Sequence, residues 1–369
     1  MNLLKPLLIW LALAACVSCR SDEGDAASEG GDGLGVPSTV DQTDDTPTDG
    51  FVPERELDAP RHRYAARLVK LWERVGMDSD SLLLAPSDVQ FSRLGLLVFD
   101  AGENSVRAFG STSGKPLFSA GRAGRGPGEL GGSFWFQGSY ARPASFDAQQ
   151  RRLTLLANNT ESMRSVALPN KRRWVSTCAL DSERTFGTAG TDVQPDFLTA
   201  VGEQVVDSLA LPWSQYAALP FLTRQSIVRQ VDDSSCAILV AFQSHFAVVT
   251  AGGTLTKGTF AESSAVIVPD TIIHETGKSW TVRFPKGTRR GPSDARTWRE
   301  QVVILFGGRT RDANRVLDVH RRSDLGYIGS IRLPHLASRI AISGDTLAVL
   351  GERDDYPLLA VYLIVPQRP

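Results

Sequence analysis

The chain has 369 residues, of which 42% are hydrophobic, and its 40 basic and 41 acidic side chains give a formal net charge of −1. The charge is unevenly divided: residues 21–58 hold twelve acidic side chains and one basic one, whereas residues 59–369 hold 37 basic and 29 acidic ones, a net charge of +8. Because this positive charge is spread along the chain without a cluster, the composition argues against a nucleic-acid-binding surface.

Residues 1–15 have the pattern of a signal peptide. Lys5 precedes an apolar run, residues 7–13, that is too short to span a bilayer. The run ends in Leu13-Ala14-Ala15-Cys16, which resembles the lipobox of bacterial lipoproteins. This predicts lipidation of Cys16; the alternatives are attachment at Cys19 or an ordinary secretory signal. The lipobox implies a protein of the bacterial cell envelope, anchored to a membrane by its lipid, and we expect the periplasmic or surface side of the outer membrane.

Residues 16–57 are predicted to form the lipidated N-terminus and an acidic linker. Besides acidic side chains, the segment is rich in Gly, Ser, Thr and Pro and has almost no apolar residues. Such a composition buries too little apolar surface to offset the entropy lost on ordering. We therefore expect a disordered, extended tether that holds the folded domain away from the membrane.

Residues 58–77 are predicted to form one short amphipathic helix. Asp58 is a suitable N-cap, Pro60 suits a first turn and Gly76 suits the C-terminal end. Apolar residues recur at helical spacing at Tyr64, Leu68, Leu71, Trp72 and Val75. The rest of the helix is basic, and we expect it to dock on the following domain; the alternative is that it lies on the membrane.

Residues 78–369 have the pattern of an all-β domain. Short β-runs, such as residues 96–99, 105–109 and 115–120, are separated by turn residues at a spacing of about 8 to 12 residues. Sustained helical periodicity is missing after Gly76, which argues against a parallel α/β fold, because its crossovers need helices.

The β-runs group into sets of about 40 to 50 residues, the period of a propeller blade. The sequence thus predicts a six-bladed β-propeller, with sets beginning near Pro86, Gly132, Lys171, Phe221, Ser264 and Pro334. The fifth set is enlarged by residues 270–300, which we interpret as an inserted loop. The sixth has only three clear strands. We expect residues 81–85 to complete it by pairing with residues 358–365, which would leave no exposed sheet edge.

Two segments carry a resemblance to a known family. Residues 96–130 contain a strand that ends in Asp100, a strand that ends at Phe109, a Gly turn and then GRAGRGPGEL. Residues 316–365 contain a strand, a Gly turn, a strand that ends in Leu-Pro and a closing blade. This order resembles the bacterial six-bladed β-propeller lipoproteins, which are relatives of NHL-repeat propellers. The resemblance implies the fold and an envelope location, but no established activity.

We interpret residues 121–129 as a structural turn between the first two blades. Its structural residues are Gly121, Gly124, Gly126, Gly128 and Glu129. The glycines would supply positive φ and close backbone approach. The Glu129 carboxylate is expected to accept backbone hydrogen bonds or to pair with Arg122 or Arg125. The rival interpretation is that Arg122 and Arg125 grip an anionic ligand.

Other chemical motifs are weak, so we predict no catalytic residue, no metal site and no cofactor. Residues 126–131 match G-x-G-x-x-G, but a strand-like sequence follows where a dinucleotide site needs a helix. The five histidines have no metal-binding spacing. Cys178 and Cys236 lie in β-runs of neighbouring blades. A buried hydrophobic role is the commoner one for such cysteines, and an envelope location also permits a disulfide between them.

Two functions remain open from the sequence. The first is a binding or scaffold module, a monomer, whose propeller takes up an unidentified protein, peptide or glycan but no nucleic acid. The alternative is an envelope hydrolase or lyase that uses the central channel, with or without a metal. A cluster of Glu, Asp, Asn or His at the ends of the inner strands would distinguish them.

Overall fold

A computed structural model of the chain describes residues 61–76, 83–126, 128–131, 133–169, 173–191, 194–201, 203–209, 226–240, 245–261, 270–273, 280–283, 293–307 and 312–367. All of them belong to one compact unit, Pro47–Pro369. The predicted signal peptide and acidic linker lie outside the described residues, as do the first residues of the predicted helix.

The described strands form six antiparallel sheets of four strands each, the blades of a six-bladed β-propeller. Blade one contains β2 (Pro86–Ser92), β3 (Gly95–Asp100), β4 (Ser105–Phe109) and β5 (Pro116–Ala120). Blade two contains β6 (Ser133–Gly138), β7 (Pro143–Asp147), β8 (Arg152–Leu155) and β9 (Arg164–Ala167), with the 3-10 helix η1 (Thr160–Ser162) before β9. Blade three contains β10 (Arg173–Ala179), β11 (Arg184–Thr191), β12 (Gln194–Val201) and β13 (Gln204–Leu209).

The remaining blades follow in chain order, except for one strand. Blade four contains β14 (Ser226–Asp232), β15 (Ser235–Val240), β16 (His245–Thr250) and β17 (Leu255–Thr259). Blade five contains β20 (Asp294–Trp298), β21 (Gln301–Leu305), β22 (Val316–Arg321) and β23 (Tyr327–Arg332). Blade six contains β24 (Leu336–Ser343), β25 (Thr346–Arg353) and β26 (Tyr356–Pro366), and its fourth strand is β1 (Ala66–Val75). A separate two-stranded sheet is made by β18 (Asp270–Ile273) and β19 (Trp280–Arg283).

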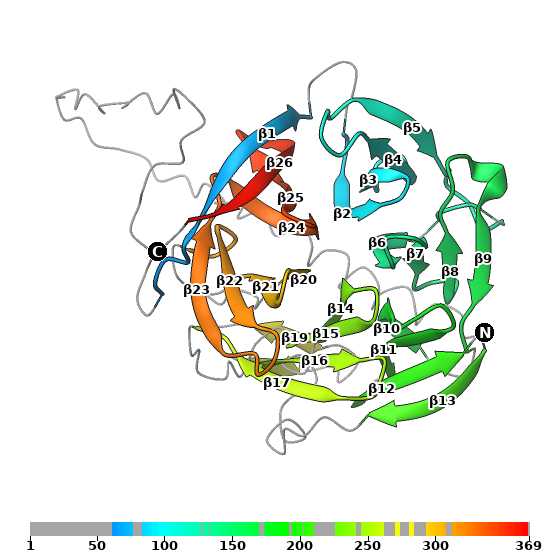
Figure 1. The fold of residues 1–369 in the computed structure, drawn as a ribbon. Helices are drawn as coiled ribbons and strands as arrows, with labels where there is room; N and C mark the ends of the chain where they lie inside the picture. The colour runs from blue at the N-terminus through cyan, green and yellow to red at the C-terminus, as the bar shows by residue number, and fades with distance from the viewer. Residues whose placement is uncertain are drawn as a thin grey trace, which may run out of the picture. The chain divides into compact units, whose positions relative to one another are not determined.

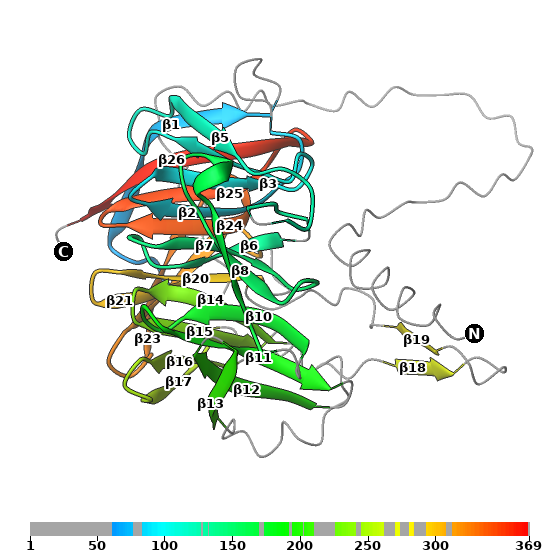
Figure 2. The ribbon, with the colours of Figure 1, turned by 90° about the vertical axis from the view of Figure 1, so that its right-hand side faces the viewer.

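The blades are arranged around a common axis, with β2, β6, β10, β14, β20 and β24 innermost (Figure 1). The inner strands β2, β6, β10, β14, β20 and β24 each contact the inner strands of both neighbouring blades. Seen from the side, several of them run along the axis, across the thickness of the ring (Figure 2). Side chains of the inner strands from opposite blades can therefore approach one another at the axis.

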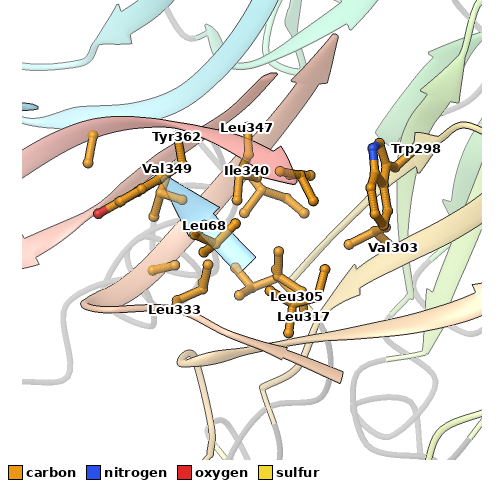
Figure 3. Close-up of a cluster of buried hydrophobic side chains, with 14 of the residues drawn as sticks. Leu68, Trp298, Val303, Leu305, Leu317, Leu333, Ile340, Leu347, Val349 and Tyr362 are labelled. Carbon is orange, nitrogen blue, oxygen red and sulfur yellow. The ribbon is translucent and has the colours of Figure 1, made fainter. Parts of the chain in front are cut away.

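The burial of each strand follows from its place in the blade. Middle strands are packed by a neighbouring blade on both faces, so they read as continuous apolar runs; β3 and β15 are buried along nearly their whole length. Outer strands such as β9 and β13 are exposed. The contact between blades five and six shows this packing, with Leu305 and Leu317 facing Leu347 and Val349 (Figure 3).

Residues 66–75 form the outer strand of blade six, so the predicted helix is wrong for them. β1 pairs antiparallel with β26 from Ala66 opposite Pro366 to Val75 opposite Leu358. A bulge between Lys70 and Trp72 shifts the register by one residue. Leu68 therefore packs between blades five and six, while Trp72 packs on blade one. Leu68 and Trp72 are four positions apart, which is also the spacing of residues on one face of a helix. This coincidence explains why the sequence pattern indicated a helix.

Ring closure by the two chain ends is confirmed, but the predicted closing segment is wrong. β1 takes the place on β26 that was expected for residues 81–85. In the described part of that segment, the amides of Leu84 and Ala85 donate to the carboxylate of Asp100, at 2.9 and 3.0 Å. The segment thus leads into β2 and is held by blade one, and the propeller begins before residue 78.

The predicted blade boundaries agree with the inner strands except in blade five. β2, β6, β10, β14 and β24 each begin within a few residues of the predicted starts. The start near Ser264 is wrong, because the inner strand β20 begins at Asp294. β20 lies within the segment that was interpreted as an inserted loop, and the hairpin of β18 and β19 precedes it.

A bulged strand and a helix over residues 66–75 predict different effects of substitutions at Leu68 and Leu71. Leu68 is 8% exposed and Leu71 is 40% exposed, whereas a helix would place both on one apolar face. We expect Leu68→Ala to lower the free energy of unfolding by about 2–4 kcal/mol through loss of buried contacts. Leu71→Ala is the matched control and should change it by less than about 0.5 kcal/mol. Urea unfolding of the two variants measures both values, and equal effects would contradict the strand.

Candidate functional site

Five charged side chains meet where the innermost strands face the axis. They are Asp88 on β2, Arg229 on β14, Asp294 and Arg296 on β20, and Arg339 on β24. We call them the axial charge cluster. Four are buried, and Arg339 is 20% exposed on its side chain. Because three guanidinium groups face two carboxyl groups, the cluster has an excess of positive charge.

Arg229 reaches across the axis of the ring. It lies on blade four, yet its Nη1 is 3.5 Å from Oδ2 of Asp88 on blade one, the opposite blade. Its Nε is 3.9 Å from Oδ1 of Asp294 on blade five. Its guanidinium carbon also lies 5.7 Å from the centre of the Trp135 ring. This side chain therefore occupies the middle of the propeller.

The two carboxylates also join neighbouring blades. Oδ2 of Asp88 accepts the amide of Phe136 on β6 at 2.7 Å, and Oδ2 of Asp294 accepts the amide of Ile340 on β24 at 3.0 Å. Between these two contacts around the ring, the hydroxyl of Ser176 on β10 accepts the amide of Val228 on β14 at 3.0 Å. Blades one and two, three and four, and five and six are thus linked by one type of contact.

Burial shifts the pKa values of two members in opposite senses. Desolvation raises the pKa of Asp88, and the charges of Arg229 and Arg339 oppose that shift. Desolvation lowers the pKa of Arg229 to about 10, so its guanidinium stays charged at neutral pH. The axis thus contains a buried cation, and burial disfavours the charged form of the Asp88 carboxyl group beside it.

The loop over residues 121–131 is organised by the Glu129 carboxylate. Its Oε2 accepts the amide of Gly126 at 2.6 Å, and its Oε1 accepts Nε of Arg122 at 3.0 Å. The hydrogen bond from Gly126 and the charge of Arg122 lower the pKa of Glu129. These are the contacts expected from the sequence.

The predicted glycines lie where side chains would collide. Gly121 has φ +95° and packs against Leu130, and Gly128 has φ +76° and packs against the carbonyl of Thr160. Gly124 and Gly126 lie against the Glu129 carboxylate. The loop therefore needs its glycines for steric reasons, whatever else it does.

Arg152 on β8 supports the same loop from blade two. Its Nη1 donates to the carbonyls of Arg125 and Gly126 at 3.0 Å, and its Nη2 donates to the carbonyl of Glu129 at 2.7 Å. Held in this way, the loop leaves Arg122 74% exposed on its side chain, and Arg125 is exposed as well. Within the described residues, no contact joins these two arginines to the axial charge cluster.

Sequence reasoning missed Arg152 and the whole axial charge cluster. A signal for one member was present: Arg229 interrupts the apolar run Ile227-Val228-Arg229-Gln230-Val231. A charged residue inside such a run is seldom buried without a partner. The partners themselves lie up to 141 positions away in the chain, and no local pattern connects them.

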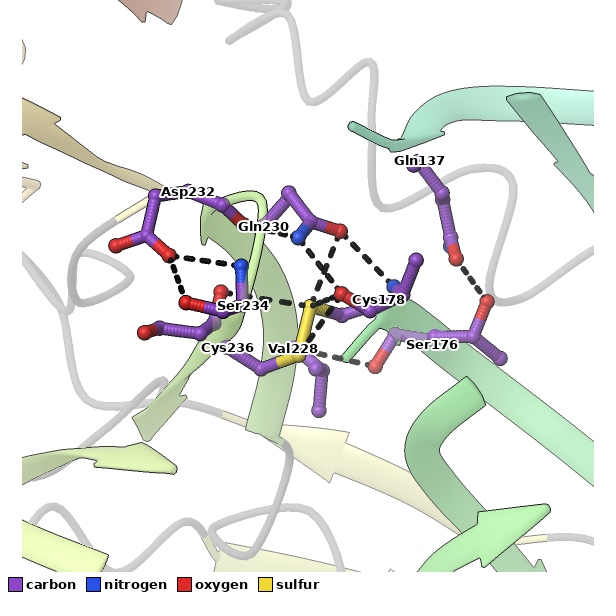
Figure 4. Close-up of a disulfide and its surroundings, with 12 residues drawn as sticks. Gln137, Ser176, Cys178, Val228, Gln230, Asp232, Ser234 and Cys236 are labelled. Atoms are coloured by element: carbon purple, nitrogen blue, oxygen red, sulfur yellow. Dashed lines mark hydrogen bonds between the residues drawn. A yellow bond between two sulfur atoms is a disulfide. The ribbon is translucent and has the colours of Figure 1, made fainter. Parts of the chain in front are cut away.

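Cys178 and Cys236 form a disulfide between blades three and four, with 6.0 Å between their Cα atoms (Figure 4). Beside it, the Gln230 amide group accepts the amide of Ala179 and donates to its carbonyl, at 2.9 and 2.7 Å. The sequence left this pairing open. Disulfides persist in oxidising compartments, so the bond indicates an extracytoplasmic location.

The described histidines show no metal centre. His320 is buried between Phe246 and Tyr327, and burial lowers its pKa. Among the residues that the structure describes, no three His, Cys, Asp or Glu side chains are grouped so that they could hold a metal ion. The same part of the chain has no helix with the length and hydropathy needed to cross a bilayer.

Comparisons with known proteins show the fold. No family model and no curated protein match the sequence. The structure is similar to a DUF4221-family member from Bacteroides vulgatus, with a TM-score of 0.53 and 9% identity over 83% of this chain and 100% of that one. It is also similar to a Bacteroides fragilis protein described as exported, with a TM-score of 0.51 and 9% identity over 82% and 95% of the two chains. At such low identity, the likeness extends to the fold alone.

The contacts of Arg152 predict that it stabilises the loop. We expect Arg152→Met to lower the free energy of unfolding by about 1–3 kcal/mol, because three carbonyls lose their donor in a partly buried site. Arg125→Met is the matched control, since the Arg125 side chain is exposed, and it should change stability by less than about 0.5 kcal/mol. Chemical unfolding of both variants gives the comparison. An Arg152 variant as stable as the control would refute the support role.

Proposed function

We propose that this chain is a lipid-anchored protein of the bacterial cell envelope whose monomeric propeller binds a protein, peptide or glycan. The anchor rests on the lipobox sequence at Leu13-Ala14-Ala15-Cys16. The likeness of residues 96–130 and 316–365 to bacterial propeller lipoproteins of the NHL-like type supports the same assignment. An extracytoplasmic location agrees with the disulfide between Cys178 and Cys236.

The closing strand supports a tethered arrangement. β1 begins at Ala66 and is the outer strand of blade six, so the chain before it enters the propeller at its rim. The buried guanidinium of Arg61 holds this part of the chain to blade five, because its Nε and Nη2 donate to the two carboxylate oxygens of Asp318 on β22, at 3.0 and 3.1 Å. A pull on the N-terminus would act on a strand that is held by both hydrogen bonds and this ion pair.

The observation that carries the binding role is the loop over residues 121–131. Glu129 and Arg152 fix its backbone, and Arg122 and Arg125 remain exposed on it. Binding residues are often found on loops that a rigid scaffold positions, because little entropy is then lost on binding. We assign Arg122 and Arg125 as partner contacts.

The anchor is tested by replacing its cysteine. Cys16→Ser should release the protein from membranes into the soluble fraction, because the acyl chains would have no attachment point. Cys19→Ser is the matched control and should leave the protein membrane-bound. Fractionation of cells followed by mass measurement of the N-terminal peptide shows both results. A Cys16 variant that remains lipidated in the membrane would refute the assignment.

The binding surface is tested by placing a photoreactive amino acid at position 125. In intact cells, irradiation should give a defined adduct from this position, because a partner would cover the loop. The same amino acid at Val206, an exposed position on β13 of blade three, is the control and should give none. Adducts from position 206 alone would move the binding surface away from the loop and contradict the proposal.

A further inference from the structure

We propose that the propeller axis binds the carboxylate of a ligand through the guanidinium of Arg229. The inference names a ligand class for the binding role proposed above and rests on that role, but it depends on different residues. It is carried by the unused hydrogen-bond donors of Arg229, by the engaged state of the neighbouring carboxylates and by the charge excess of the axial cluster.

Arg229 is buried with most of its donors unused. Its side chain is 3% exposed, and among the described residues Nε and Nη2 have no hydrogen-bond partner. The hydrogen bond from its Nη1 to Asp88 is long, at 3.5 Å. A guanidinium has five N–H donors, and buried donors are nearly always satisfied by protein, water or ligand. An acceptor is therefore expected at the Nε–Nη2 edge.

That edge is the one by which other arginines of this chain hold carboxylates. Arg61 binds Asp318 through Nε and Nη2, at 3.0 and 3.1 Å. Arg299 binds Asp345 through the same two atoms, at 2.9 and 2.8 Å. The two N–H groups of this edge are parallel and match the spacing of two carboxylate oxygens. The Nε–Nη2 edge of Arg229 has the same geometry, but Oδ1 of Asp294 lies 3.9 Å from Nε, beyond hydrogen-bonding distance. Among the described residues, no carboxylate oxygen therefore hydrogen-bonds to this edge.

The nearby aspartates are not free to turn toward this edge. Asp88 accepts the amides of Val89 and Phe136, and Asp294 accepts those of Ala295 and Ile340. Turning either carboxylate would break a contact between blades. A ligand can supply the missing acceptor without that loss.

The charges of the cluster favour an anion, and Arg339 is the most exposed member of the cluster. Three guanidinium groups face two carboxyl groups, so one added carboxylate brings the cluster to balance. The Arg339 side chain is 20% exposed, and its Nε lies 3.9 Å from Oδ1 of Asp88 without a hydrogen-bond partner among the described residues. It marks the end of the cluster that solvent reaches, so an incoming carboxylate would meet Arg339 before Arg229.

The test measures binding of acetate, the simplest carboxylate, to the purified full-length protein. The melting temperature and the calorimetric heat of binding are measured in sodium acetate, in sodium chloride at equal ionic strength and in inorganic phosphate. We expect saturable stabilisation by acetate that chloride does not reproduce. Arg229→Met should weaken acetate binding at least tenfold, and Arg229→Lys should weaken it as well, because lysine keeps the charge but lacks the two-donor edge. Arg299→Met is the control and should bind acetate like the wild type.

The outcomes separate this inference from the proposed function. Equal effects of acetate and chloride, a preference for phosphate over acetate, or unchanged binding by folded Arg229→Lys would each overturn the axial site. A defined adduct from position 125 would leave the loop surface intact in all three cases. Should Arg229→Met fail to fold, the Nε–H resonance of Arg229 in the wild-type protein, titrated with acetate, decides the question: a saturable shift supports the site and an unchanged resonance overturns it.

Discussion

The backbone pairing of β1 with β26 is the constraint on which the ring depends. Without β1, blade six would have three strands, β26 would present an unpaired edge, and the clusters around Leu68 and Trp72 would lose part of their cover. The strand also reaches the next blade: Nε1 of Trp72 donates to the carbonyl of Ser111 at 3.0 Å, and Nε of Arg74 donates to that of Gly114 at 2.8 Å. One segment thus completes blade six and fastens it to blade one.

A second set of contacts closes the ring from inside. Asp88, Ser176 and Asp294 each accept a backbone amide from the following blade. The inner strands β6, β14 and β24 donate these three amides, so this type of contact alternates around the ring. A carboxylate that accepts a buried amide is well satisfied there. The carboxylates of Asp88 and Asp294 also balance part of the positive charge of Arg229, Arg296 and Arg339.

The sequence was informative where structure is local and uninformative where it is not. Continuous apolar runs such as residues 96–99 indicated strands packed on both faces, and the Asp and Gly residues between them indicated the turns: Asp100, Asp147 and Asp232 each accept amides of the turns that follow. The loop contacts of Glu129 followed from residues within a few positions. The bulge in β1 could not be predicted from the local sequence, because it depends on pairing with a strand almost 300 residues later. The axial charge cluster depends on four separate blades, so only the charge of Arg229 within an apolar run hinted at it.

The buried arginines at the axis are not explained by stability alone. Replacing a buried ion pair with apolar side chains of similar size is often neutral or stabilising, because desolvation costs about as much as the attraction returns. Asp88 and Asp294 have a structural role, since they join blades, but Arg229 satisfies neither of them with a short hydrogen bond. A methionine could fill much the same volume without a buried charge. A guanidinium that crosses the axis with no hydrogen-bond partner at Nε and Nη2 among the described residues fits the carboxylate site proposed above, and its burial would strengthen the pairing with any carboxylate that reaches it.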